Sequence, residues 1–172
     1  MVEREGAQPM NVTKVVVFFG VLTGVLALDI TTKLLVQQHL HLYQRIPIIG
    51  EYVQLTYIYN PGAAFGIQLG DYSRVIFLVL SLVALAALLG MYWFTPAIAR
   101  IRLVAISLIC GGAIGNLIDR VRSEQGVVDF IDVGVNTVRW PVFNVADMAV
   151  TAGAIVLALS LWKEEQRVEE RR

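Results

Sequence analysis

Four long apolar stretches dominate the pattern of hydrophobic and polar positions along the chain. They run from Val15 to Leu28, from Val75 to Phe94, from Leu103 to Ile118 and from Val142 to Trp162. The first continues at helical spacing past Asp29 and Lys33 to about Gln37, and the last is broken only by Asp147. A helix of about 20 apolar residues is long enough to cross a bilayer. The pattern therefore predicts four transmembrane helices.

Two of the connections have the alternating pattern of β-strands. In residues 50–60, Val53 and Leu55 face one way while Gln54 and Thr56 face the other. Residues 127–140 are also rich in strand-forming residues, with a Gly-containing turn near GVN that predicts a hairpin. We therefore expect an all-α integral membrane protein whose four helices carry a small extracytoplasmic β-sheet.

The composition agrees with a membrane protein. Hydrophobic residues make up 56% of the chain, charged residues make up 16%, and the mean hydropathy is +0.64. The formal net charge is zero, so nothing in the charge suggests a nucleic-acid partner. We predict one membrane domain over residues 1–172, with spans at about 13–37, 74–94, 100–119 and 142–162. The connections at about 38–73 and 120–141 would carry the strands on one side.

The four-span topology places the unusual polar residues together. Both termini must lie on one side, and the ends of spans one and three then share the other side with the starts of spans two and four. The residues on that other side are Asp29, Lys33, Asn60, Asp71, Asn116, Asp119, Arg120, Asp129, Asn144 and Asp147. Eight Lys and Arg residues fall on the terminal side and six on the other. The positive-inside rule therefore predicts cytoplasmic termini and an extracytoplasmic polar cluster.

Asp147 is a candidate functional residue because it lies five residues into an apolar run. An ionised carboxylate is costly there unless it is paired, protonated or hydrated, and intramembrane acids are functional by default. Asp129, on the connection that leads into this span, is the acid best placed to meet it. Two adjacent carboxyl groups share a proton, so one can deprotonate a water while the other protonates a carbonyl.

Each polar motif also has a structural interpretation. Asp29 and Lys33 are spaced i,i+4 and could form only a helical salt bridge, and Asp119 could simply pair with Arg120. The spacing of Gly111 and Gly115, and equally that of Gly20 and Gly24, is typical of close helix packing.

Other classes of function also remain open. A small proton- or ion-coupled transporter would use intramembrane acids, but it would spread them through the membrane depth. A non-catalytic assembly subunit would tolerate asparagine at both aspartates. Cys110 is expected to be a buried packing residue, and His39 with His41 is expected to be interfacial, so we predict no metal and no cofactor.

Five ordered motifs resemble those of bacterial lipoprotein signal peptidase, the signal peptidase II family. They are DITTK at 29–33, NPGAAFG at 60–66, GGAIGNLIDR at 111–120, VVDFI at 127–131 and FNVAD at 143–147. The resemblance implies a membrane-embedded aspartic endopeptidase in the bacterial inner membrane. Such an enzyme removes the signal peptide of a prolipoprotein by cutting before a diacylglyceryl-modified cysteine. It implies no cofactor, and we expect membrane lipid around a monomer.

The resemblance also implies roles for the motif residues. Asp129 and Asp147 correspond to the catalytic pair. The residues that line or support the site would be Asn60, Gly62, Asn116, Arg120, Asn144, Asp29, Lys33 and Asp119. The chain departs from the commoner family pattern at Ile30, Pro61 and Met148, which concerns contacts to substrate rather than the chemistry.

Overall fold

The computed structural model describes residues 11–62 and 70–170, without the side chains of Asp71 and Val168. Residues 63–66 of the NPGAAFG motif lie outside this part. The helices are α1 (Val12–His39), α2 (Ser73–Phe94), α3 (Arg100–Arg122) and α4 (Val145–Glu169), with a 3-10 turn at Gly70–Tyr72 before α2. The strands are β1 (Arg45–Ile49), β2 (Val53–Asn60), β3 (Val127–Val135) and β4 (Val138–Arg139).

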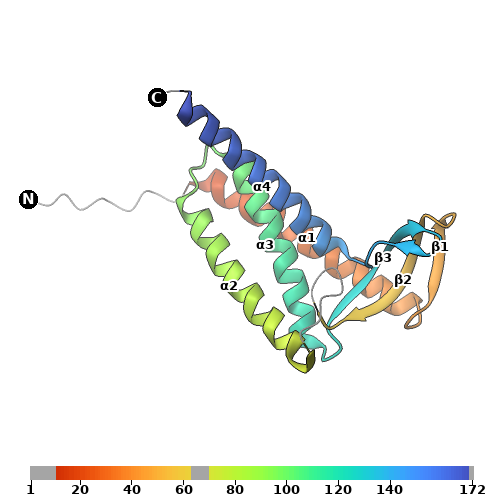
Figure 1. The fold of residues 1–172 in the computed structure, drawn as a ribbon. Helices are drawn as coiled ribbons and strands as arrows, with labels where there is room; N and C mark the ends of the chain where they lie inside the picture. Colours follow the sequence, from red (N-terminus) through yellow and green to blue (C-terminus); the bar gives the residue numbers. More distant parts are fainter. Residues whose placement is uncertain (1–10, 63–69, 171–172) are drawn as a thin grey trace, which may run out of the picture.

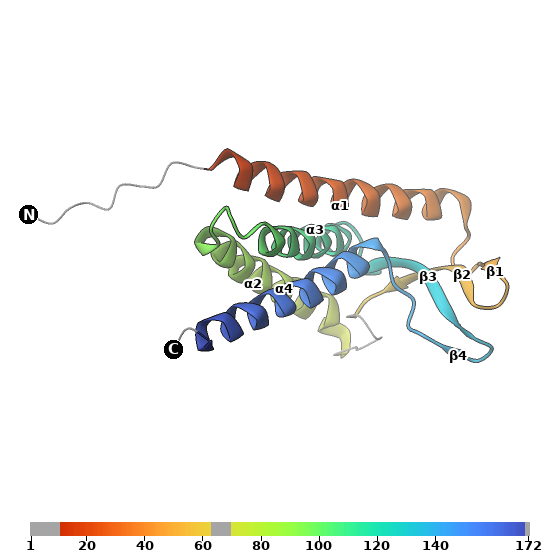
Figure 2. The ribbon, with the colours of Figure 1, turned by 90° about the horizontal axis from the view of Figure 1, so that it is seen from above.

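The four helices form a bundle with the sheet at one end (Figure 1). All four are long and apolar enough to cross a membrane. Helix α3 packs against α1, α2 and α4, and the start of α1 and the end of α4 lie at the end of the bundle away from the sheet (Figure 2). The predicted fold class is confirmed.

The sheet is antiparallel in the order β1-β2-β3-β4. Strand β1 was not predicted, since Pro47 weakens its strand pattern and only its pairing with β2 reveals it at the sheet edge. A bulge between Leu55 and Ile58 interrupts the pairing of β2 with β3. The predicted alternation fails there, because the neighbours Thr56 and Tyr57 are both buried.

Helix α4 begins later than the apolar run that contains it. Asn144 is the N-cap, and Phe143 still pairs with Ile131 of β3 in an extended conformation. Asp147 therefore lies in the first turn of the helix, where its charge interacts favourably with the helix dipole. The structure thus supplies a local reason for a carboxylate at this point of the chain.

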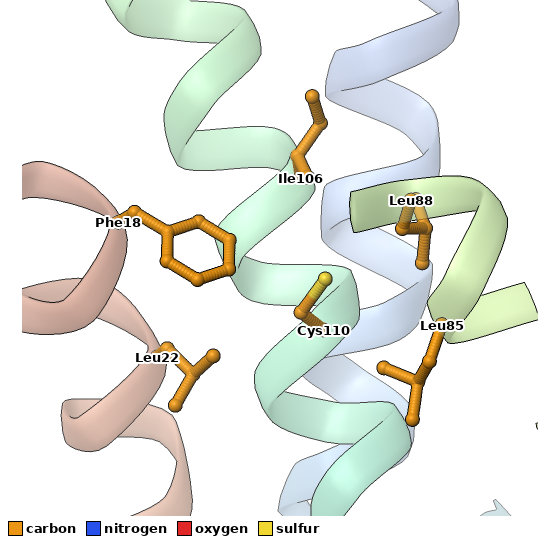
Figure 3. Packing of buried hydrophobic residues seen from close by; sticks show 6 residues of the cluster. All are labelled: Phe18, Leu22, Leu85, Leu88, Ile106 and Cys110. Carbon is orange, nitrogen blue, oxygen red and sulfur yellow. The ribbon is translucent and has the colours of Figure 1, made fainter. Parts of the chain in front are cut away.

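Two apolar clusters hold the site-bearing elements in place. The first joins α1, α2 and α3 and contains Phe18, Leu22, Leu85, Leu88, Ile106 and Cys110 (Figure 3). The Cys110 thiol is fully buried in it, as expected for a packing residue. The second joins the end of α1 to the sheet through Val36, Leu40, Tyr57, Val128 and Phe130. It anchors β3, the strand that carries Asp129, against α1.

The close-packing interpretation holds for one glycine pair and is wrong for the other. A Cβ at Gly111 would lie 2.9 Å from Val25 Cβ, and one at Gly115 would lie 2.5 Å from Asp29 Oδ2. Gly20 and Gly24 have no described heavy atom within 4 Å of such a Cβ. Helices α1 and α3 therefore approach closely on the α3 glycines, while the α1 pair faces outward.

Gly111→Ala is expected to destabilise the protein by about 1–3 kcal/mol, because the added methyl group must push α1 away from α3. Gly24→Ala is the matched control and should leave the melting temperature in detergent unchanged or slightly raised, since alanine favours helix. Equal melting temperatures for the two variants would contradict the close approach of these helices.

Candidate active site

Asp147 and Asn144 are locked together at the start of α4. Asn144 Oδ1 accepts a hydrogen bond from the Asp147 N–H at 2.9 Å, and Asp147 Oδ2 accepts one from the Asn144 N–H at 3.2 Å, which is a capping box. From α3, Asn116 Nδ2 donates to Asp147 Oδ1 at 2.8 Å. Both carboxylate oxygens of Asp147 are therefore held by amide donors.

Asp129 lies in the middle of β3 and is 1% exposed. Asn60 Nδ2 donates to its Oδ2 at 3.0 Å, and Asn144 Nδ2 donates to its Oδ1 at 2.7 Å. The fully buried Asn144 side chain thus contacts Asp129 directly while it caps the backbone N–H of Asp147. Asn144 therefore links the two aspartates that the sequence paired, because its NH₂ group contacts the Asp129 carboxylate and its oxygen contacts the Asp147 N–H.

The surroundings of Asp129 favour its protonated form. Burial raises the pKa of Asp129 to about 7, and the negative charge of Asp147 adds to this, whereas the hydrogen bonds from Asn60 and Asn144 partly offset it. One proton held between two carboxyl groups at neutral pH is the state that acid-base chemistry by such a pair requires.

We expect the stability of the protein to fall as the pH rises from about 4 to about 7. In that window folded Asp129 keeps a proton that the unfolded chain has lost, so ionisation costs the folded state about 4 kcal/mol by the end of it. Melting temperatures in detergent across this range would test it, and Asp129→Asn should flatten the profile. An unchanged slope in that variant would mean that another group titrates.

On the far side of Asn116, Lys33 connects three polar groups. Its Nζ lies 2.8 Å from Asp29 Oδ2 and 2.8 Å from Asp119 Oδ2, and donates to Asn116 Oδ1 at 3.0 Å. The expected i,i+4 salt bridge is therefore present. Asp119 pairs with Lys33, whereas the Arg120 guanidinium donates to the carbonyl oxygens of Asn116 and Gly62 and lies over the Phe77 ring.

Arg120 completes the network from α3. Its Nη2 donates to the Gly62 carbonyl oxygen at 2.9 Å and its Nη1 to that of Asn116 at 3.3 Å. The Gly62 N–H in turn donates to Asn60 Oδ1 at 3.0 Å, which orients the Asn60 amide toward Asp129. All ten residues predicted for the site therefore belong to one connected set of contacts.

Sequence reasoning missed several contributors. Arg74 Nε donates to the Arg120 carbonyl oxygen at 2.7 Å, and the backbone N–H groups of Ala146 and Val128 are bound by Asp29 and Asp119. The only sequence signal for Arg74 was its position at the start of the second predicted span, on the side of the polar residues. The backbone N–H groups could not be predicted, because nearly every residue carries one.

A mainly apolar pocket of about 470 Å³ opens beside Asp147. It lies between α4 and the segment that precedes it, and is lined by Trp140, Pro141, Val142, Phe143, Asp147, Met148, Thr151, Ala152 and Ile155. Within residues 11–62 and 70–170, no group of three or more His, Cys, Asp or Glu residues is arranged to hold a metal ion.

Comparison with known proteins gives one consistent result. The family model described as signal peptidase (SPase) II matches residues 21–163. The lipoprotein signal peptidase of Geobacter metallireducens is 44% identical over 151 residues, which cover 87% of this chain and 93% of that protein. That of Halothermothrix orenii is 44% identical over 142 residues, covering 83% and 92%.

A solved structure agrees with these sequence matches. It is described as a bacterial membrane enzyme determined by the in meso method at 2.3 Å resolution, and it superposes with a TM-score of 0.79 at 31% identity. The match covers 87% of this chain and 89% of that one. Sequence and structure together establish that the chain belongs to the signal peptidase II family.

Proposed function

We propose that this protein is a membrane aspartic endopeptidase that removes the signal peptide from prolipoproteins. It would hydrolyse the peptide bond just before a diacylglyceryl-modified cysteine. The observation that carries the proposal is the pair Asp129 and Asp147, held around the Asn144 amide beside an apolar pocket. The transporter alternative is not supported, because the family is a peptidase family and the acids gather at one end of the bundle.

The proposed reaction needs only the dyad and a water molecule. The ionised carboxylate takes a proton from water, the water oxygen bonds to the scissile carbonyl carbon, and the protonated carboxyl group gives its proton to the carbonyl oxygen. When this tetrahedral intermediate collapses, one of its hydroxyl groups returns a proton to the dyad, the C–N bond breaks, and the dyad gives its other proton to the leaving amine of the cysteine. Asn60, Asn116 and Asn144 keep both carboxyl groups oriented throughout this cycle.

The pocket beside Asp147 suits the lipid part of the substrate. Its wall on α4 consists of Met148, Thr151, Ala152 and Ile155, which follow one helix face away from the dyad. An acyl chain lying along this face would place the glyceryl-cysteine beside Asp147.

The orientation in the membrane follows from the same proposal. The substrate emerges on the extracytoplasmic side, so the sheet and the dyad would face that side and both termini would be cytoplasmic. The Lys and Arg distribution favours this arrangement. All the proposed site residues come from one chain, which supports an active monomer.

The proposal is tested with purified protein in detergent and two lipobox peptides that differ only in the diacylglyceryl group. We expect cleavage before the lipidated cysteine, identified by mass spectrometry, and at least about 10-fold slower cleavage without the lipid. Equal cleavage of both peptides would contradict lipid recognition, and no cleavage of either by folded protein would contradict the function.

Ala152→Trp is expected to lower kcat/KM for the lipidated peptide by about 10-fold or more, because the indole fills the pocket. Ala154→Trp introduces the same side chain on α4 at an exposed position that does not line the pocket, and it should have little effect. If both variants lose activity equally, or neither does, the acyl chain binds elsewhere.

A further inference from the structure

The carboxylates of buried Asp29 and partly buried Asp119 bind the backbone directly before each proposed catalytic residue. Asp29 Oδ1 accepts a hydrogen bond from the Ala146 N–H at 2.9 Å, one residue before Asp147. Asp119 Oδ2 accepts one from the Val128 N–H at 3.3 Å, one residue before Asp129. The two aspartates of the dyad are thus each preceded by a residue that is tied to a helix outside their own element.

Lys33 joins these two attachments. Its Nζ is 2.8 Å from Asp29 Oδ2 and 2.8 Å from Asp119 Oδ2, and the Lys33 side chain is 4% exposed. The paths therefore run from Asp147 through Ala146 and Asp29 to Lys33, and from Asp129 through Val128 and Asp119 to the same ammonium group. Shielding from water makes such charge-assisted bonds strong and short.

The third bond of Lys33 helps to set which way the Asn116 amide faces. An ammonium group can only donate hydrogen bonds, so Asn116 must turn its carbonyl oxygen to Lys33, at 3.0 Å. Its NH₂ group then points to Asp147 Oδ1, to which it donates at 2.8 Å. Asn144 Nδ2 donates to the same Asn116 oxygen at 3.1 Å, so Lys33 and Asn144 together hold the Asn116 amide in this orientation.

We propose that Lys33, Asp29 and Asp119 form a clamp that sets the separation and orientation of the Asp129–Asp147 dyad, with Lys33 as its central positioning residue. The inference rests on the proposed function for its effect on catalysis, but not for its geometry. A carboxylate pair can share one proton and act on one carbonyl only at a suitable separation, and a misplacement of about 1 Å can cost on the order of 10²-fold in rate.

A double-mutant cycle on the lipidated peptide tests the clamp. Lys33→Met and Asp119→Ala are each expected to lower kcat by about 10-fold to 100-fold, with KM within about 2-fold of wild type. Because both break the same path, the double variant should lose no more than the worse single variant. A loss equal to the product of the two single losses, or normal kcat in either single variant, would overturn the proposal.

Hydrogen exchange at two backbone amides tests the same geometry without any cleavage. Asp119→Ala removes the acceptor of the Val128 N–H, and through Lys33 it should also loosen Asp29. We therefore expect faster exchange, by about 10-fold, at Ala146 as well as at Val128. Faster exchange at Val128 alone would mean that Asp119 acts only locally and would overturn the clamp, whether or not the wild-type protein cuts the peptide.

The far end of the bundle offers a control for ion-pair loss. Arg102 on α3 pairs with Glu164 on α4, away from the dyad. Arg102→Met should leave kcat and the exchange of both amides at wild-type values. Should Lys33→Met fail to fold because it leaves carboxylates unpaired, Asp119→Ala decides alone, since the Asp119 side chain is 18% exposed and less dependent on its partner.

Discussion

Asp129→Asn and Asp147→Asn are each expected to lower kcat for a diacylglyceryl-modified lipobox peptide by about 10³-fold or more. The amide has nearly the shape of the carboxyl group but can neither take a proton from water nor give one to the carbonyl oxygen. Each substitution therefore removes one half of the acid-base pair. KM should change little, since Asp129 does not line the pocket that would hold the lipid and asparagine keeps the size of the Asp147 side chain that does.

Asp132→Asn is the matched control for these two variants. Asp132 lies on β3 three residues after Asp129 and is equally buried, but its carboxylate accepts from Thr56 Oγ1 at 2.8 Å and pairs with Arg139. Its loss should lower the melting temperature and leave kcat within about 3-fold of wild type. A dyad variant that stays folded and cuts normally would refute the aspartic mechanism.

The second large effect is expected at Asn144, whose amide oxygen caps the Asp147 N–H. Its NH₂ group donates to Asp129 and also lies 3.1 Å from Asn116 Oδ1 and 3.2 Å from the Val128 carbonyl oxygen. Asn144→Ser keeps an oxygen that can cap the Asp147 N–H, so the start of α4 should remain stable. It removes the NH₂ group that donates to Asp129 Oδ1 at 2.7 Å. We expect kcat to fall by about 10²-fold to 10³-fold, as for the loss of other preorganised donors, while the melting temperature changes little.

Asn144→Ala completes this test because it removes the cap and the donor together. It should show the same loss of kcat and also lose about 1 kcal/mol of stability. Equal activity of Asn144→Ser and wild type would show that the bond to Asp129 is not needed in the reaction. Activity in Ser but not in Ala would assign the whole effect to the cap.

The members of the site were largely predictable from the sequence, but their partners were not. Chain connectivity placed Asp129, Asn144 and Asp147 at one membrane surface, and the cost of burying a carboxylate singled out Asp147. The sequence offered Asp119 a neighbouring cation, Arg120, yet in the structure its partner is Lys33. That choice depends on how α1 packs against α3, which no local pattern records.

The fold likewise has elements that the sequence predicts and elements that depend on tertiary contacts. Four apolar runs of sufficient length predict four membrane helices by themselves. In the bilayer no water is available to the backbone, and a helix satisfies its backbone hydrogen bonds internally. Strand β1, the bulge in β2 and the start of α4 at Val145 depended on contacts with other parts of the chain. Identical glycine spacings on α1 and α3 likewise had different meanings, since only Gly111 and Gly115 meet a neighbouring helix.

The sequence by itself therefore determined the number of helices that could span a membrane, the end of the bundle that carries the polar residues, and which two aspartates we propose as catalytic. Each of these follows from properties that a residue has in any arrangement, such as its hydropathy, its charge and its position in the chain order. The tertiary structure alone decided that the Asn144 amide contacts both the Asp129 carboxylate and the Asp147 N–H, and that Lys33 joins Asp29 to Asp119. Hydrogen bonds and ion pairs act over about 3 Å, and only the packing of distant segments sets distances on that scale.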